Sequence, residues 1–256
     1  GTAGTGTGPN MAAHSSLTEH LTVVLNTILG RVNREGDLIE NGLLLYPEMP
    51  HRAQATAPRA PASGPPSRLR NLRGYRGEMP TAALAEEILT PGEGRIRALI
   101  VSGGNPAVAF PNHELTLEAL ADYVIAPTLA LERADVPHLM DRWFREPYTN
   151  YTDPVVERDG DVLNEWEVFW ELASRLGSTL PLPGGSPDMT TRPSTDEIIE
   201  RSYAGSRMPL DEVRANRRKV HPDLRLVVEP ADPSCTTKFT PAPDDFMDEL
   251  AALLAE

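Results

Sequence analysis

The sequence predicts an α/β fold: an open, mostly parallel sheet flanked by helices, with a long irregular Pro/Arg-rich loop. Two observations favour this class. The run 96–101 (Ile-Arg-Ala-Leu-Ile-Val) is short and rich in β-branched residues, as in a strand that a parallel sheet buries on both faces. Amphipathic helical patterns also alternate with short apolar runs along the chain, which is typical of α/β proteins.

The expected helices and strands follow one another in a regular order. The first helix starts at a capping box formed by Ser16 and Glu19, continues with leucines at helical spacing, and ends at Gly30. Further helices are expected at 81–89, 113–120, 164–176, 195–203 and 244–255. Strands are expected at 96–101, 121–128 and 224–229.

Composition limits the classes of partner and site. The net charge of −13 argues against a nucleic-acid or anionic-membrane partner. The single cysteine, Cys235, excludes an internal disulfide and any multi-cysteine metal or iron–sulfur site. No apolar stretch approaches the roughly 18–20 residues that span a membrane, and the first residues do not form a signal peptide. We therefore expect a cytoplasmic protein without a membrane span.

Composition also divides the chain into three segments. Residues 1–46 are a Gly-rich turn plus a helix, and residues 78–256 hold most of the expected helices and strands. Residues 47–77 are rich in Pro, Ala and Arg, which indicates a loop or linker because such a segment buries little apolar area. Its arginines are typical of a solvated surface loop. Alternatively, they bind an acidic partner or a cofactor phosphate by electrostatic attraction.

Two glycine-rich turns are the candidate ligand-binding elements. The turn 4–8 can present backbone N–H groups at a helix N-terminus, although a flexible chain end explains it equally well. The turn 102–106 follows the expected strand 96–101, and ligands of open α/β sheets bind at such strand ends, whereas the alternative is an ordinary turn. The Asn105 side-chain amide can hydrogen-bond a ribose, or alternatively it caps the turn. The His14 side chain can contact a cofactor phosphate, or alternatively it lies exposed in a turn.

Four stretches carry a family resemblance. The first is the Gly-rich turn and helix at 4–31, and the second is 96–106, which contains Gly-Gly-Asn-Pro. The third is 121–133, which contains Ala-Asp-Tyr-Val and Leu-Glu-Arg. The fourth is the helix at 166–177, which contains Trp, Leu-Ala and Leu-Gly. In this order they resemble the molybdopterin-dependent oxidoreductases of the dimethyl sulfoxide reductase and formate dehydrogenase type. That family carries a molybdenum bis(molybdopterin guanine dinucleotide) cofactor.

The resemblance implies a set of cofactor-binding residues. Loops such as 6–10 and 103–106 contact the pyrophosphate and guanosine parts of the pterin dinucleotides in this family, and Asp122 would buttress a turn near them. The implied cofactor-binding residues are Gly6, Thr7, Gly8, Asn10, His14, Gly103, Gly104, Asn105, Pro106 and Asp122. No residue is assigned a catalytic or metal-ligating role, because the molybdenum ligand and the iron–sulfur cysteines of the family lie upstream of the matching segments. A central strand of the family is also missing between Leu120 and Ala121.

The expected function is therefore the central cofactor-binding part of a molybdopterin oxidoreductase, inactive as an isolated fragment. The parent enzyme would carry out two-electron redox chemistry at molybdenum on a small substrate, and an absent N-terminal segment could bind a 4Fe–4S cluster. Its expected partners are the pterin dinucleotide, the remaining domains of the parent enzyme and an electron-transfer subunit. Two alternatives stay open: a molybdenum-free homologue that is a structural or electron-transfer subunit, as in respiratory complex I, and an unrelated nucleotide-binding α/β protein.

Overall fold

The structure is a computed structural model that describes residues 2–39, 43–56, 64–74, 77–120, 123–137, 141 and 144–255. Its contacts divide the chain into two compact units. Unit 1 consists of Gly1–Ala57, Pro137–Asn150 and Ser206–Glu256, and unit 2 consists of Pro58–Val136 and Tyr151–Gly205. Each unit is described by itself below.

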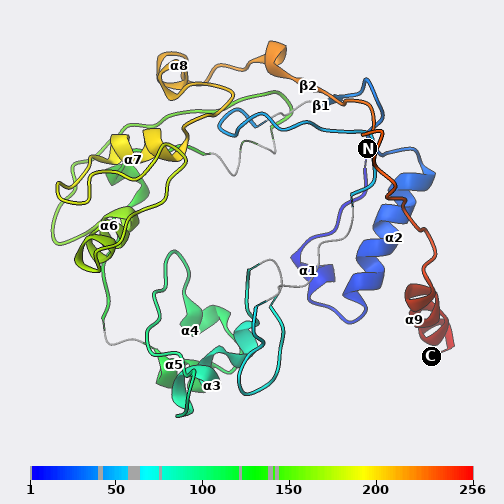
Figure 1. Cartoon of the computed structure of the whole chain (residues 1–256), viewed down its shortest axis with the longest axis horizontal. Helices are drawn as coiled ribbons and strands as arrows, with labels where there is room; N and C mark the ends of the chain where they lie inside the picture. The colour runs from blue at the N-terminus through cyan, green and yellow to red at the C-terminus, as the bar shows by residue number, and fades with distance from the viewer. Residues whose placement is uncertain are drawn as a thin grey trace. The chain divides into compact units, whose positions relative to one another are not determined.

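Unit 1 combines helices with a small sheet (Figure 1). Its elements are α1 (Thr7–Asn10), α2 (Ser15–Ile28), β1 (Leu38–Ile39), α8 (Leu210–Ala215), the 3₁₀ turn Pro222–Leu224, β2 (Leu226–Val227) and α9 (Asp244–Ala255). The core contains Leu44, Met208, Val213 and Val228, all almost completely buried. The backbone N–H of Met208 donates to the carbonyl of Leu44 at 3.1 Å, so the segment before α8 is fixed to this core.

Unit 2 is built from short helices. Its elements are the 3₁₀ turn Thr81–Ala83, α3 (Leu84–Leu89), α4 (Pro106–Ala109), α5 (His113–Ala119), the 3₁₀ turn Ala130–Glu132, α6 (Glu165–Arg175) and α7 (Thr195–Ser202). Helices α3, α4 and α5 lie together, as Figure 1 shows. The apolar side chains of α6 and α7 that are buried are Trp170, Ala173, Ile198 and Ile199.

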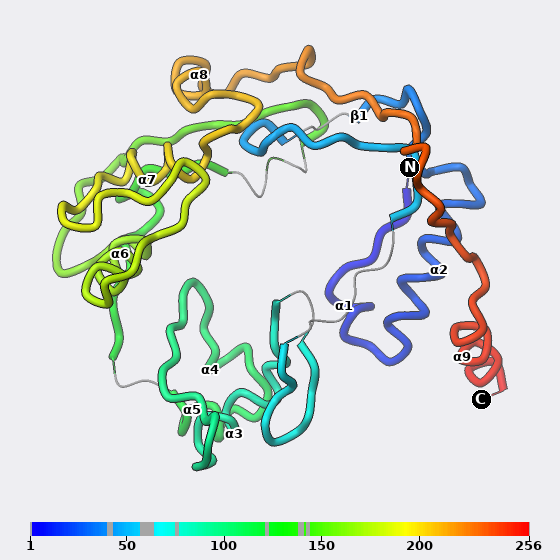
Figure 2. The backbone as a smooth tube through the Cα atoms, viewed as in Figure 1, coloured from blue at the N-terminus to red at the C-terminus, as the bar shows by residue number. Residues whose placement is uncertain are grey.

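The predicted α/β class with an open, mostly parallel sheet is wrong. Within the described residues the one sheet is antiparallel and pairs β1 with β2, in the register Leu38↔Val227 and Ile39↔Leu226. The run 96–101 forms no strand, and Figure 2 shows the chain there as an open trace before α4. Residues 123–126 likewise form no strand. β-Branched residues favour extended backbone, but a strand also needs a continuous ladder of hydrogen bonds with a partner. Among the described residues no strand pairs with 96–101, and residues 123–128 share only an isolated bridge between Pro127 and Leu163.

The predicted helices are confirmed with small shifts at their ends. The helix expected from Ser16 is α2, and those expected at 81–89, 113–120, 164–176, 195–203 and 244–255 are Thr81–Leu89, α5, α6, α7 and α9. Gly30 has φ +63° and lies just past the end of α2, in the left-handed conformation that glycine adopts without strain. No helix of the described residues is long and apolar enough to cross a membrane.

Candidate functional site

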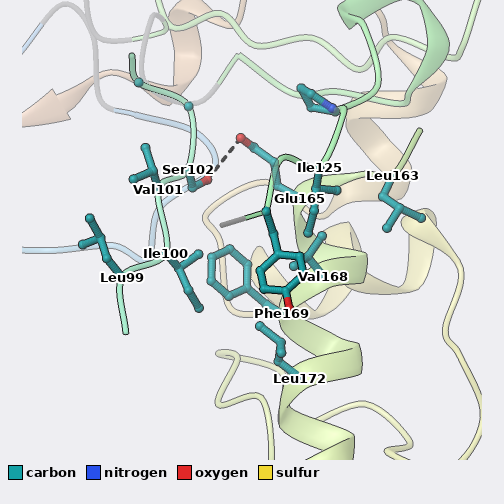
Figure 3. Close-up of a pocket in the computed structure, with 14 residues that line it drawn as sticks. Leu99, Ile100, Val101, Ser102, Ile125, Leu163, Glu165, Val168, Phe169 and Leu172 are labelled. Carbon is teal, nitrogen blue, oxygen red and sulfur yellow. Dashed lines mark hydrogen bonds between the residues drawn. The ribbon is translucent and has the colours of Figure 1, made fainter. Parts of the chain in front are cut away.

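A pocket of about 520 Å³ in unit 2 is a candidate site, and it lies at one of the two predicted glycine-rich turns. Residues 99–104 form one wall, and the other walls come from 123–127, Leu163 and α6 (Figure 3). Pockets that bind small molecules or cofactors usually measure about 300–1,000 Å³, so this one has room for a heterocyclic ring system.

The walls of the pocket are mainly apolar. In Figure 3, Ile100 and Ser102 point towards α6, whereas Leu99 and Val101 point to the other side of the extended chain. Helix α6 contributes residues 165, 168, 169 and 172, which share one face of a helix because they are three or four positions apart. Phe169 keeps 39 % of its surface exposed, so its ring is available to a planar ligand.

The polar groups of the pocket lie at the Gly103 turn. The Ser102 hydroxyl donates to Glu165 Oε1 at 3.1 Å, the dashed contact in Figure 3. Gly103 has φ +75°, a conformation that residues with a side chain rarely adopt, so the backbone itself favours glycine there. Glu165 is the one charged residue that lines the pocket among the described residues. The site therefore offers a carboxylate acceptor beside apolar and aromatic walls.

The first turn of α6, which carries Glu165, is held by a network around the buried Glu167. Glu167, only 5 % exposed, accepts the backbone N–H of Asn164 at 2.6 Å, which satisfies a free donor at the helix start. Arg158 and Arg192 pair with the same carboxylate at 2.7 and 3.4 Å. The Asn164 side chain accepts the Thr128 hydroxyl at 2.7 Å. These contacts fix the helix end that carries Glu165.

A smaller pocket of about 260 Å³ surrounds the same turn of α6. Glu165 lines both pockets, and Arg133 is the cationic residue that lines the smaller one. The acidic Asp135 also lines it, with its Oδ1 accepting the Val136 N–H at 2.8 Å. The start of α6 thus has a ring-sized apolar pocket on one side and a guanidinium on the other.

The N-terminal glycine-rich turn lies in unit 1 and runs beside α2. Gly6 precedes α1, which contains Thr7, Gly8 and Asn10. The Asn26 side chain pairs with the backbone of Ala3, accepting its N–H at 2.8 Å and donating to its carbonyl at 2.9 Å. A Cβ added at Gly6 or Gly8 would meet nothing within 4 Å, so the turn is open to solvent.

The predicted capping box at the start of α2 is not formed. The helix begins at Ser15, and His14 precedes it with φ +58° and without a side-chain cap. Glu19 instead accepts a hydrogen bond from the Thr5 hydroxyl, which draws its carboxylate away from the helix end. His14 Nδ1 lies 2.6 Å from Glu249 of α9, so the imidazole faces a carboxylate.

Four of the remaining predicted residues lie at the start of α4 or just before it. Gly103 and Gly104 line the large pocket, whereas Asn105 and Pro106 are the residues at which α4 begins. Asn105 makes no side-chain cap there, and its amide is exposed. Asp122 lies outside the described residues. The structure therefore places two of the ten predicted residues in the pocket, and their role in cofactor binding stays a prediction.

Sequence reasoning missed the α6 wall of this pocket. The sequence predicts the helix 164–176 but assigns neither Glu165 nor Phe169 to a site. A signal was present, because Glu165, Val168, Phe169 and Leu172 form a second row at helical spacing. That row continues the apolar surface around the helix beyond the buried face.

The described residues contain no group of three or more His, Cys, Asp or Glu side chains that could hold a metal ion. Comparisons with protein families, with curated proteins and with solved structures found no match to this chain.

Proposed function

We propose that the chain is a cofactor-binding part of a molybdopterin oxidoreductase, in which the start of α6 holds the guanosine end of a pterin dinucleotide. The observation that supports this most is the large pocket at Gly103 and Gly104, because the family-like turn coincides with a ring-sized cavity that has one carboxylate. The four family-like stretches of sequence support it independently.

The pocket fits a purine better than a pyrophosphate. Apolar and aromatic surfaces such as Phe169 stack on bases, and base–aromatic stacking is worth about 1–3 kcal/mol. The Glu165 carboxylate accepts N–H donors, and guanine presents two adjacent ones at N1 and N2. A phosphate beside the Glu165 carboxylate would be repelled, so the phosphates would lie outside the large pocket.

When bound, the cofactor would supply two-electron redox chemistry at molybdenum. The residues of this chain would bind and orient its nucleotide end. Glu165 would read the base, Phe169 and Ile100 would cover it, and Gly103 would let the backbone pass close by. Glu167 would keep the carboxylate of Glu165 in position through the start of α6.

Calorimetric titration of the chain with GMP and with AMP tests the base preference. We expect GMP to bind about tenfold more tightly, because adenine offers Glu165 only one donor group, and a charge-assisted hydrogen bond contributes about 1.5–3 kcal/mol. Glu165→Gln should remove most of this preference. The matched control is Glu171→Gln, which alters a carboxylate on the same helix that pairs with Arg175 at 2.6 Å. Equal affinity for the two nucleotides, or an unchanged preference in Glu165→Gln, would contradict the site.

Release of the cofactor tests the family assignment separately. Protein produced in cells that make the dinucleotide should yield a fluorescent pterin, GMP and molybdenum after denaturation and oxidation. Repeated absence of pterin and molybdenum would overturn the assignment. Guanine-selective binding without pterin would favour a second candidate, a mononucleotide-binding protein, because the pocket lies within one unit and needs no second binding turn.

A further inference from the structure

The carboxylate of Glu165 has one hydrogen-bond donor among the described residues, the hydroxyl of Ser102. The Ser102 Oγ and Glu165 Oε1 are 3.1 Å apart, and Figure 3 shows this contact as a dashed line. A Cβ built on Gly103 would lie 3.8 Å from the same carboxylate oxygen, so Oε1 lies beside the Gly103 turn. The turn at Ser102 and Gly103 therefore sets the direction of the Glu165 side chain.

The buried network at the start of α6 holds the backbone of Glu165 but leaves its carboxylate to Ser102. Arg158 and Arg192 both pair with Glu167, and the backbone N–H of Asn164 donates to the same carboxylate. A glutamate side chain that moves freely loses rotamer freedom when a ligand binds it, and this loss lowers affinity. A side chain that a hydrogen bond already holds loses less.

The orientation of the carboxylate matters most for a ligand that binds both of its oxygens. Guanine presents two adjacent N–H donors, at N1 and N2, and such a paired contact requires that the base and the carboxylate lie close to one plane. Adenine presents one donor group, at N6, which can reach a single oxygen over a wider range of carboxylate angles. An ionised carboxylate has about four acceptor positions, so the bond from Ser102 leaves room for both guanine donors.

Ser102 also joins the two walls of the pocket. It belongs to the extended segment 99–104, and residues 97–104 make no backbone–backbone hydrogen bond with any other described residue. Within the described part of the chain, its bond to Glu165 is the one side-chain hydrogen bond between this segment and α6. The same contact therefore places the wall and orients the carboxylate.

We propose that Ser102 is a positioning residue for base selection, which holds the Glu165 carboxylate in one orientation so that guanine can bind both of its oxygens. This role rests on the proposed function, because it has a consequence only where the pocket binds a guanine base. It adds to that function a second residue that determines the preference for guanine.

Calorimetric titration of the full chain with GMP and with AMP tests this role. Ser102→Ala should weaken GMP binding about two- to tenfold, which is the cost of immobilising one flexible side chain, and should change AMP binding less than about twofold. Ser102→Thr keeps the hydroxyl and should restore most of the preference for GMP. Damage to the wall alone would weaken both nucleotides by the same factor, so the ratio of the two affinities separates positioning from a structural role.

The matched control is Ser178→Ala, which alters an exposed serine beyond the end of α6 and outside the pocket and should leave both affinities unchanged. A native preference for GMP that Glu165→Gln removes but Ser102→Ala keeps would overturn the role of Ser102 and leave the proposed function standing. Equal weakening of GMP and AMP binding in Ser102→Ala would overturn it too. A native chain that binds the two nucleotides equally would contradict the proposed function, and this role with it.

Discussion

At the scale of single residues, the glycines of the two predicted binding turns are not the crowded ones. A Cβ at Gly4, Gly6, Gly8 or Gly104 would meet nothing within 4 Å. Gly184, which no motif marks, is surrounded: a Cβ there would lie 3.0 Å from Ala204 Cβ and 3.0 Å from Arg201 Cα. The adjoining turn is also held by the Arg201 guanidinium, which donates to the carbonyls of Gly184 and Ser186 at 3.3 and 3.2 Å.

Gly184→Ala should destabilise the chain by about 1–3 kcal/mol, because overpacking at a backbone contact forces the turn away from α7. Gly104→Ala is the control and should change stability by less than about 0.5 kcal/mol, as expected for an uncrowded surface position. Urea unfolding of both variants measures the difference. Similar free energies of unfolding for the two variants would show that the turn at Gly184 accommodates the added methyl group without loss of stability.

Asp141 should make the stability of the chain depend on pH. Burial raises the pKa of this carboxyl to about 6, against an opposing hydrogen bond with Thr149. The folded chain therefore binds the proton more tightly than the unfolded chain, whose aspartates titrate near pH 4. The stabilisation that this proton gives is complete below about pH 4 and is lost as the pH rises through 6.

Asp141→Asn should accordingly raise the free energy of unfolding at pH 7 by about 1–3 kcal/mol, because it removes the cost of a buried charge. It should also flatten the change in stability between pH 4 and 7. Denaturant unfolding at several pH values measures both effects, with the exposed Asp159→Asn as control. A variant that keeps the pH dependence of the native chain would assign that dependence to other groups.

At the scale of elements, α6 connects the buried interior of unit 2 with the pocket. One face carries the buried Trp170 and Ala173, and the next face carries Glu165 and Phe169. Trp170 Nε1 donates to the Asp188 carbonyl at 2.9 Å, which fixes the rotation of the helix about its axis. The direction in which Glu165 points thus follows from packing on the opposite side.

Glu167→Gln should lower the free energy of unfolding by about 1–3 kcal/mol, because it leaves Arg158 and Arg192 without their shared carboxylate and weakens the start of α6. Glu171→Gln alters an exposed pair on the same helix and should cost less than about 0.5 kcal/mol. Thermal unfolding compares the two. Glu167→Gln should also weaken GMP binding. If Glu167→Gln and Glu171→Gln changed GMP affinity equally, the network would have no role in positioning Glu165.

The helices could be predicted from the sequence because their signals are local. Apolar spacing, caps and terminal glycines such as Gly30 and Gly177 all lie within a few residues of the element that they define. Of the strands, the one expected at 224–229 forms in part as β2, whereas 96–101 and the described part of 121–128 form no strand, because pairing depends on residues distant in the chain. The candidate site could be predicted to a similar extent. Gly103 belongs to a turn motif that a short stretch of sequence shows, whereas the contact between Glu165 and Ser102 joins residues 63 positions apart.

At the scale of the whole molecule, strong negative charge coexists with exposed β-branched segments. The net charge is −13 and the isoelectric point is about 4.9. Leu99, Ile100 and Val101 are 42–57 % exposed, and Val124 is 92 % exposed. Unpaired extended segments of this composition can pair with other chains, and net charge is what keeps such chains apart.

The chain should therefore associate increasingly as the pH falls from 8 towards 5, since repulsion between copies declines as the net charge approaches zero near the isoelectric point of about 4.9. Sedimentation velocity or light scattering at both pH values measures this association. The double variant Val101→Ser, Val124→Ser should reduce it several-fold at pH 5.5, because both changes lower the apolar and β-forming character of the unpaired segments.

Val108→Ser is the matched control: Val108 is 79 % exposed but lies in α4, outside both segments. If the control reduced association as much as the double variant, general surface apolarity rather than strand pairing would be the cause. If the association of the native chain did not change between the two pH values, charge repulsion would not be what keeps these segments apart.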